Sequence, residues 1–221
     1  WQQRMEGSGF WLEQWLTHQR RDSYWRHGSI NEHYDRVQIP VMAISGWADG
    51  YSNAVFRLLE NLRGPRMGLI GPWGHKYPHQ GQPGPTMDFL SEAVRWWDRW
   101  LKGEASGIDS EPMLRAWMQD TAPPEPNLRT RPGRWVGENA WPSPRIRRVG
   151  HPLLRGRVGG PGGPEGSGHL EIQSPLSVGL YAGRWASFSA TPDLPHDQRE
   201  EDGGSMVFDS EPLTSPVEIL G

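Results

Sequence analysis

Asp49 and His75 are the two residues of this sequence whose types and positions most favour catalysis. Each follows a short apolar run: Asp49 lies in the segment G-W-A-D-G, and His75 lies in the segment G-P-W-G-H. A carboxylate that holds Nδ1 of a histidine fixes the tautomer of the ring and stabilises the imidazolium formed when a nucleophile gives up its proton. The two residues therefore predict the acid and the base of an acyl-transfer triad.

Both residues also have a structural interpretation. A-D-G is a common turn sequence, and a histidine after Pro-Trp-Gly can simply belong to a loop. The remaining histidines are expected at the surface or in loops. Because the pair offers only two ligands and the sequence has neither an H-E-x-x-H pattern nor a Walker loop, we expect no metal site and no cofactor.

The elements that must position this pair are two strands and the helix between them. Apolar runs at residues 40–45 and 66–70 predict buried strands, and Gly64-Pro65 ends the helix before the second strand. Strand, helix and strand with short connections predict a parallel crossover unit, and ligands of such sheets bind beyond the carboxyl ends of the strands. The apolar face of the helix has three-to-four spacing and comprises Tyr51, Val55, Leu58, Leu59 and Leu62.

A nucleophile is missing from the expected place. In α/β-hydrolases the chain order is nucleophile, acid, histidine, so a G-x-S-x-G turn should precede Asp49. The sequence contains no such turn: Gly7-Ser8-Gly9 and Gly166-Ser167-Gly168 have the wrong spacing, and residues 203–207 lack the last glycine. The sequence also begins at Trp1 without an initiator methionine. We therefore expect a piece of a longer enzyme whose upstream part carries the serine.

Composition and net charge limit the kinds of partner that this chain is expected to bind. The 221 residues suffice for one or two domains, the net charge of −3 offers nothing to attract a nucleic acid, and the absence of cysteine excludes thiolate chemistry. No apolar run approaches the roughly 18 residues of a membrane span. We expect no nucleic-acid or membrane partner. A homo-oligomer is compatible with these features, and the compartment is not indicated beyond a slight preference for the cytoplasm.

Two helical regions flank the crossover unit. Residues 1–36 predict amphipathic helices, either a cap inserted before the first strand or ordinary packing helices. A second helix is expected from an N-cap at Thr86 to the stop at Lys102-Gly103. Its wide apolar stripe predicts burial on two sides, against the sheet and the next domain. That stripe includes Leu90, Val94, Trp97 and Leu101.

From about Glu111 onward, short strand-like runs alternate with turn residues, which predicts an all-β sandwich or jelly roll. The last apolar run, 217–220, reaches the end of the sequence, so we expect an incomplete domain. The other expected strands are residues 113–118, 133–136, 169–172, 176–180 and 206–208.

Five stretches make the chain resemble the cocaine esterase / X-Pro dipeptidyl-peptidase group of α/β-hydrolases. They are IPVMAISGWADGYSNA, GLIGPWGHKYPH, AVRWWDRWLKGEASGI, GRWVGENAWP and AGRWASFSATPDLPHDQREEDGGSMVFDSEPL. The resemblance implies that Asp49 is the triad acid and His75 the base, with the nucleophile elbow and oxyanion hole upstream. It implies an α/β fold: the end of a helical cap in residues 1–36, the C-terminal part of an α/β-hydrolase sheet in 37–108, and the start of a jelly-roll domain in 109–221.

The expected function is that of a serine-hydrolase fragment acting on esters or amides, with a small-molecule ester or peptide as its substrate. Trp47, Tyr51 and Trp73 flank the pair and are candidate pocket walls, although core packing explains each tryptophan equally well. One alternative is a non-catalytic, aromatic-rich β-sandwich that binds sugars or peptides. Another is a subunit that acquires its nucleophile from a second chain. A fragment should expose apolar faces and be poorly soluble.

Overall fold

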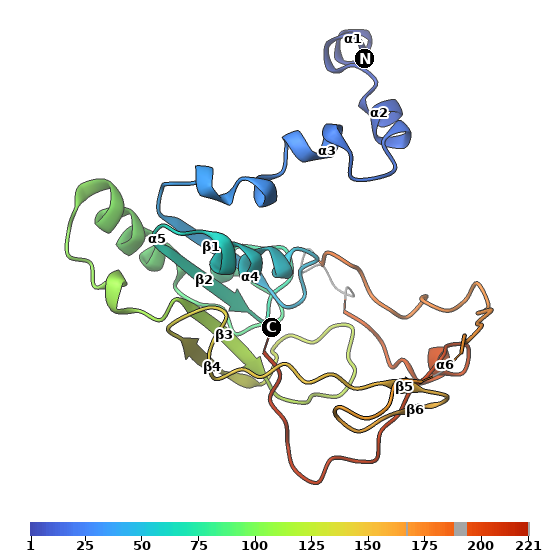
Figure 1. Ribbon diagram of the computed structural model, residues 1–221. Helices are drawn as coiled ribbons and strands as arrows, with labels where there is room; N and C mark the ends of the chain where they lie inside the picture. Colours follow the sequence, from blue (N-terminus) through green and yellow to red (C-terminus); the bar gives the residue numbers. More distant parts are fainter. Residues whose placement is uncertain (167, 188–193, 221) are drawn as a thin grey trace.

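The computed structural model describes residues 1–166, 168–187 and 194–220 and is drawn in Figure 1. Ser167, residues 188–193 of the last matching stretch, and Gly221 lie outside these ranges. The main sheet has the order β1-β2-β3-β4, with β1, β2 and β3 parallel and β4 antiparallel to β3. Its strands are β1 (Val41–Gly46), β2 (Arg66–Gly71), β3 (Leu114–Gln119) and β4 (Gly133–Glu138).

The predicted crossover unit is confirmed. Strand β1 pairs in parallel with β2 from Val41 opposite Arg66 to Gly46 opposite Gly71, so both strands end at the same level. Helix α4 (Ser52–Asn61) connects them and ends before Gly64-Pro65, as expected. The parallel arrangement brings the loops that carry Asp49 and His75 to one edge of the sheet.

Helices cover both faces of β2. A side chain on Gly68 would point at Leu59 and Val55, which places α4 on that face. The neighbouring Met67 points to the opposite face, because side chains alternate along a strand, and it packs there with Trp96. Burying a leucine such as the fully buried Leu59 contributes about 1.5–3 kcal/mol, so this two-sided core fixes the strand ends.

Residues 1–36 form the expected helices but do not join this core. Figure 1 shows α1 and α2 lying away from the sheet, and none of residues 1–36 is buried. Trp15 instead packs against Trp11 and Trp25, with ring centroids 4.5 and 6.2 Å apart. Both interpretations of residues 1–36, a helical cap and ordinary packing helices, therefore stay predictions. The elements are α1 (Gln2–Ser8), α2 (Trp11–Thr17), α3 (Ser23–His27), η1 (Ile30–Glu32) and η2 (Tyr34–Arg36).

Helix α5 (Phe89–Trp97) corrects two expectations. Its N-cap is Asp88 and not Thr86, because the Asp88 carboxylate accepts a hydrogen bond from the Ser91 N–H. The prediction that its stripe is buried on two sides is wrong: Trp96 beside the stripe is buried, whereas the four residues named for the stripe are more than half exposed. The exposed set is Leu90, Val94, Trp97 and Leu101.

The helical path continues past α5 as a wider turn, η4 (Asp98–Lys102), and stops as predicted at Gly103. Gly103 has a φ of 75°, a left-handed conformation that a glycine adopts without strain. The remaining short helical turns are η3 (Pro78–Gln80) and η5 (Ile108–Ser110).

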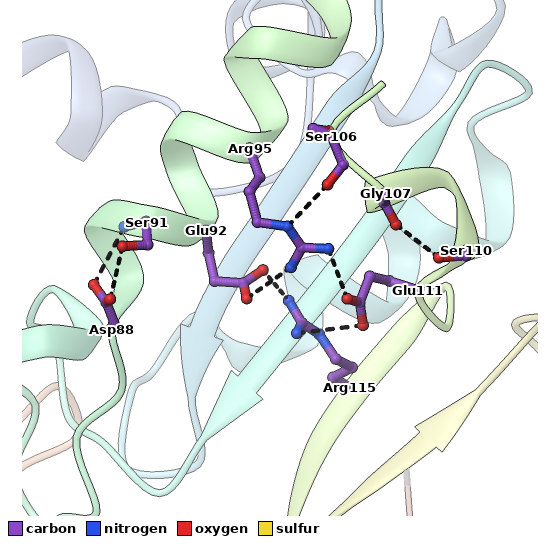
Figure 2. A network of polar contacts seen from close by, with 9 residues as sticks. All are labelled: Asp88, Ser91, Glu92, Arg95, Ser106, Gly107, Ser110, Glu111 and Arg115. Atoms are coloured by element: carbon purple, nitrogen blue, oxygen red, sulfur yellow. Dashed lines mark hydrogen bonds and ion pairs between the residues drawn. The ribbon is translucent and has the colours of Figure 1, made fainter. Parts of the chain in front are cut away.

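A network of ion pairs ties α5 to β3 (Figure 2). Glu92 accepts hydrogen bonds from Arg115 at 2.7 Å and from Arg95 at 3.1 Å, and Arg95 also donates to Glu111 at 2.8 Å. Burial acts to raise the pKa of Glu92, but the hydrogen bond and charge of Arg115, helped by Arg95, outweigh it and lower that pKa. The network therefore stabilises the folded state only while Glu92 is ionised.

Replacing Glu92 by glutamine is expected to lower the free energy of unfolding by about 1–2 kcal/mol, because the partly buried Arg115 then loses its nearest carboxylate. Since the folded pKa of Glu92 is depressed, its contribution is complete above the pKa of a free glutamate, about 4.3, and is lost as pH falls through the folded value. Urea unfolding at several pH values measures both effects. The exposed Glu60 on α4 provides the control, and a Glu92→Gln midpoint no lower than that of Glu60→Gln would contradict the role of the network.

The β-rich half is only partly as expected. The strands predicted at 113–118 and 133–136 form β3 and β4, and β3 pairs with β2, so the sheet continues beyond residue 108. The strand predictions for 169–172, 176–180, 206–208 and 217–220 are wrong. Glycine and proline are frequent in residues 150–166, and apolar residues after them, such as Leu176 and Leu180, are exposed and pair with no strand of the described residues. The jelly roll stays a prediction.

Small elements complete the described part of the second half. They are the hairpin of β5 (Leu153–Leu154) and β6 (Arg157–Val158), and the short helix α6 (Arg199–Asp202). An isolated bridge joins Arg157 to Asp209. Across the described ranges, every helix is too short or too polar to cross a bilayer.

Candidate active site

The structure brings Asp49 and His75 together at the carboxyl ends of β1 and β2. Nδ1 of His75 lies 2.9 Å from Oδ2 of Asp49. An ionised carboxylate only accepts hydrogen bonds, so this contact is a hydrogen bond when Nδ1 carries the proton and donates it. The Asp49 side chain is 8% exposed and that of His75 is 47% exposed. The acid is thus sheltered beneath a base that reaches the surface.

Backbone hydrogen bonds join the two loops beneath the pair. The N–H of Trp47 donates to the carbonyl of Gly71 at 2.9 Å, and the N–H of Ala48 donates to the carbonyl of Trp73 at 3.0 Å. Gly46 allows this approach, because a Cβ there would lie 1.9 Å from the Trp73 carbonyl oxygen. The distance between acid and base is therefore set mainly by backbone contacts and not by flexible side chains.

Asp49 divides its two carboxylate oxygens between the turn and the histidine. Oδ1 accepts the N–H of Tyr51 at 2.9 Å, which closes an Asx turn, while Oδ2 faces His75. The turn interpretation and the triad interpretation of this residue are therefore compatible. The second hydrogen bond also fixes the direction in which the carboxylate points.

Tyr51 is the aromatic residue that lies beside the pair at the surface. Its ring is 56% exposed and meets the His75 ring edge-on, with centroids 5.9 Å apart. The ring of Trp185 also meets the Tyr51 ring edge-on, with centroids 5.2 Å apart. Sequence reasoning missed Trp185 as a neighbour of the pair, since it lies more than a hundred residues away along the chain; its only signal was its place in the last matching stretch.

The two predicted tryptophans have mainly structural contacts. Trp73 is 1% exposed and donates its indole N–H to the carbonyl of Pro85 at 2.7 Å. Trp47 is half-buried, donates to the carbonyl of Trp117 at 2.7 Å and stacks on Phe56. Trp73 supports its loop from inside and presents no surface to a substrate. A substrate contact by Trp47 or Tyr51 stays a prediction.

A second histidine–aspartate contact connects α2 to α3. Nδ1 of His18 lies 2.5 Å from Oδ2 of Asp22, and Asp22 also accepts the N–H of Tyr24 as the N-cap of α3. The hydrogen bond from His18 is the main cause that lowers the pKa of Asp22. Sequence analysis expected His18 only at the surface or in a loop and missed this partner, although the spacing of four residues was a signal. The contact belongs to the cap of a helix.

Other kinds of site have little support within the described ranges. No group of three or more potential ligands from histidine, cysteine, aspartate or glutamate is found there that could hold a metal ion. A cavity of about 520 Å³ lies in the C-terminal region, and neither Asp49 nor His75 lines it. Its lining consists of Tyr181, His196, Asp197, Arg199 and Glu200.

Two family models match the chain. Residues 1–77, which include Asp49 and His75, match X-Pro dipeptidyl-peptidase (S15 family). Residues 106–221 match the X-Pro dipeptidyl-peptidase C-terminal non-catalytic domain, and this match covers more than half of the chain. The chain therefore belongs to the cocaine esterase / X-Pro dipeptidyl-peptidase group, as its motifs predicted, and its mixed sheet fits part of an α/β-hydrolase fold.

Two relatives are named as esterases, and both are longer than this chain. Two proteins named as serine esterases, from Mycobacterium bovis and Mycobacterium tuberculosis, are each 27% identical over 215 residues, which is 88% of this chain and 32% of theirs. The chain thus spans about a third of the length of these relatives. A CocE/NonD family hydrolase from Staphylococcus aureus aligns with a TM-score of 0.49 and 11% identity, over 68% of this chain and 25% of that one.

Proposed function

We propose that this chain supplies the acid and the base of a serine hydrolase that cleaves esters or amides, and that the nucleophilic serine comes from outside these residues. The contact of 2.9 Å between Nδ1 of His75 and Oδ2 of Asp49 carries the proposal. It joins the ends of two adjacent parallel strands, where an α/β sheet binds its ligands. The family to which the chain belongs and the names of its relatives support the hydrolase class.

The proposed mechanism proceeds through an acyl-enzyme. The serine Oγ attacks the carbonyl carbon while Nε2 of His75 takes its proton, and Asp49 stabilises the imidazolium through Nδ1. The bond to the leaving alcohol or amine then breaks as His75 returns that proton to it. In the second step, which releases the acyl group, a water molecule attacks the acyl carbon and gives its proton to His75. The serine then leaves with that proton.

The proposed substrate is a small ester or an X-Pro peptide. Both are acyl compounds that the same pair of residues can process, and the matching family and the named relatives point to one each. We place a helical cap at residues 1–36 and the start of a jelly roll in residues 109–221, beyond the strands β3 and β4 that extend the main sheet, with the substrate held between these parts. Tyr51 is the aromatic residue best placed to contact it, because its exposed ring lies beside His75.

Treatment of the purified chain with a fluorophosphonate probe, followed by peptide mapping, tests where the nucleophile lies. The expected result is no labelled serine, while a serine hydrolase labelled in parallel confirms the probe. A labelled serine in this chain that is lost on His75→Ala would contradict the proposed division, because it would place the nucleophile within these residues.

A further inference from the structure

We propose that residues Trp185 to Ser187 are positioning residues of the Asp49–His75 pair. They lie in the region matched by a family model described as a non-catalytic domain. The inference rests on the proposed function and adds to it a contribution from the second half of the chain. Two sets of contacts support it: Ser187 contacts the backbone of the His75 loop, and the Trp185 ring contacts the Asp49 loop.

Ser187 holds the histidine loop. Its carbonyl accepts a hydrogen bond from the backbone N–H of His75, and the residue is 2% exposed. The preceding Gly74 makes room for it, because a Cβ on Gly74 would lie 2.4 Å from the Ser187 carbonyl oxygen. Backbone therefore packs directly on backbone at the residue that carries the imidazole.

Trp185 holds the aspartate loop. Its ring meets Tyr51 edge-on at 5.2 Å, and a Cβ on Gly50 would lie 2.5 Å from the same ring. Gly50 follows Asp49 directly, and Tyr51 donates the hydrogen bond that orients the Asp49 carboxylate. Since Trp185 is 72% exposed, burial in a core does not explain its position, whereas contact with this loop does.

The two contacts involve both loops, Ser187 that of His75 and Trp185 that of Asp49. Beneath the pair, the loops are already joined through Trp47 and Ala48. Residues 185–187 add a second connection between the loops, through the His75 N–H and the Tyr51 ring. Removing the Trp185 ring should therefore make the contact between Asp49 and His75 break more often, without unfolding the sheet. In a hydrolase this would lower kcat with little change in KM, because the pair acts in the chemical step.

Hydrogen exchange measured by NMR on the full ¹⁵N-labelled chain tests the inference without a substrate. Trp185→Ala should accelerate exchange of the His75 Nδ1 proton and backbone N–H by about three- to tenfold, the effect of losing one edge-to-face ring pair. Trp185→Phe should restore most of the protection. Trp97→Ala, which removes an exposed tryptophan from α5, is the matched control and should leave both rates unchanged.

Gly50→Ala provides a second route to the same result, because the added methyl group displaces the Trp185 ring while the tryptophan stays in the chain. It should accelerate exchange to a similar degree. Unchanged exchange at His75 in Trp185→Ala and Gly50→Ala would overturn the inference. If the pair forms and responds to Trp185 but the assembled enzyme cleaves no ester or amide, the proposed function fails and the positioning role stands.

Discussion

Replacing His75 by alanine is expected to lower kcat of the assembled enzyme by about a thousandfold or more, with little change in KM. The assembled enzyme means this chain together with the part that we propose carries the serine. Without the imidazole no group takes the serine proton, while the surfaces that bind the substrate are unchanged. Initial rates of hydrolysis of a chromogenic ester, measured over a range of substrate concentrations, separate the two parameters.

Asp49→Asn should lower kcat by a similar order, because the amide lacks the charge that stabilises the imidazolium and can favour the wrong tautomer of His75. Glu60→Gln is the control, since Glu60 is exposed on α4 and lies outside the parts that we place around the substrate. A His75→Ala enzyme that retains most of its kcat would contradict the assignment of the base. An equal loss in Glu60→Gln would mean that the rates report folding and not catalysis.

Gly46→Ala is expected to have the largest effect on stability, a loss of about 3 kcal/mol or more in the free energy of unfolding. The added methyl carbon would lie 1.9 Å from the Trp73 carbonyl oxygen and 2.6 Å from its carbon. Both are backbone atoms, so one loop has to move. That movement breaks the hydrogen bond from Ala48 to Trp73 and separates the loops of acid and base.

Denaturation in urea, followed by tryptophan fluorescence, measures this loss as a lower midpoint. Gly150→Ala is the matched control, because nothing lies within 4 Å of the position that its Cβ would take. The control should change the free energy of unfolding by less than about 0.5 kcal/mol. A Gly46→Ala midpoint equal to that of the unchanged chain would show that the two loops are not packed as closely as described.

The sequence was sufficient to predict the crossover unit and the meeting of its loops. The helical spacing of Val55 and Leu59 and the apolar runs on either side define the elements, and parallel topology then places Asp49 and His75 at one edge. This part was predictable because each step depends on local pattern and on a general rule of sheet connection.

Other features depend on information that a local pattern does not contain. The stripe of Leu90 and Val94 shows that a helix face is apolar, but not whether anything in this chain covers it. The turn-rich half contains apolar runs such as 176–180 that are short and pair with no strand in the part of the chain that the structure describes. Trp185 reaches the pair through a contact distant in sequence, and only the three-dimensional structure reveals such a contact.

The ¹⁵N chemical shifts of the His75 ring test the central claim most directly. They are measured on this chain at a pH where the ring is neutral, in solution or in the solid state. The account predicts a protonated Nδ1 that donates to Asp49 and an unprotonated Nε2 able to take a proton from a serine, with this preference lost in Asp49→Ala. A proton on Nε2 in the unchanged chain would contradict the account, because His75 could not then act as the base.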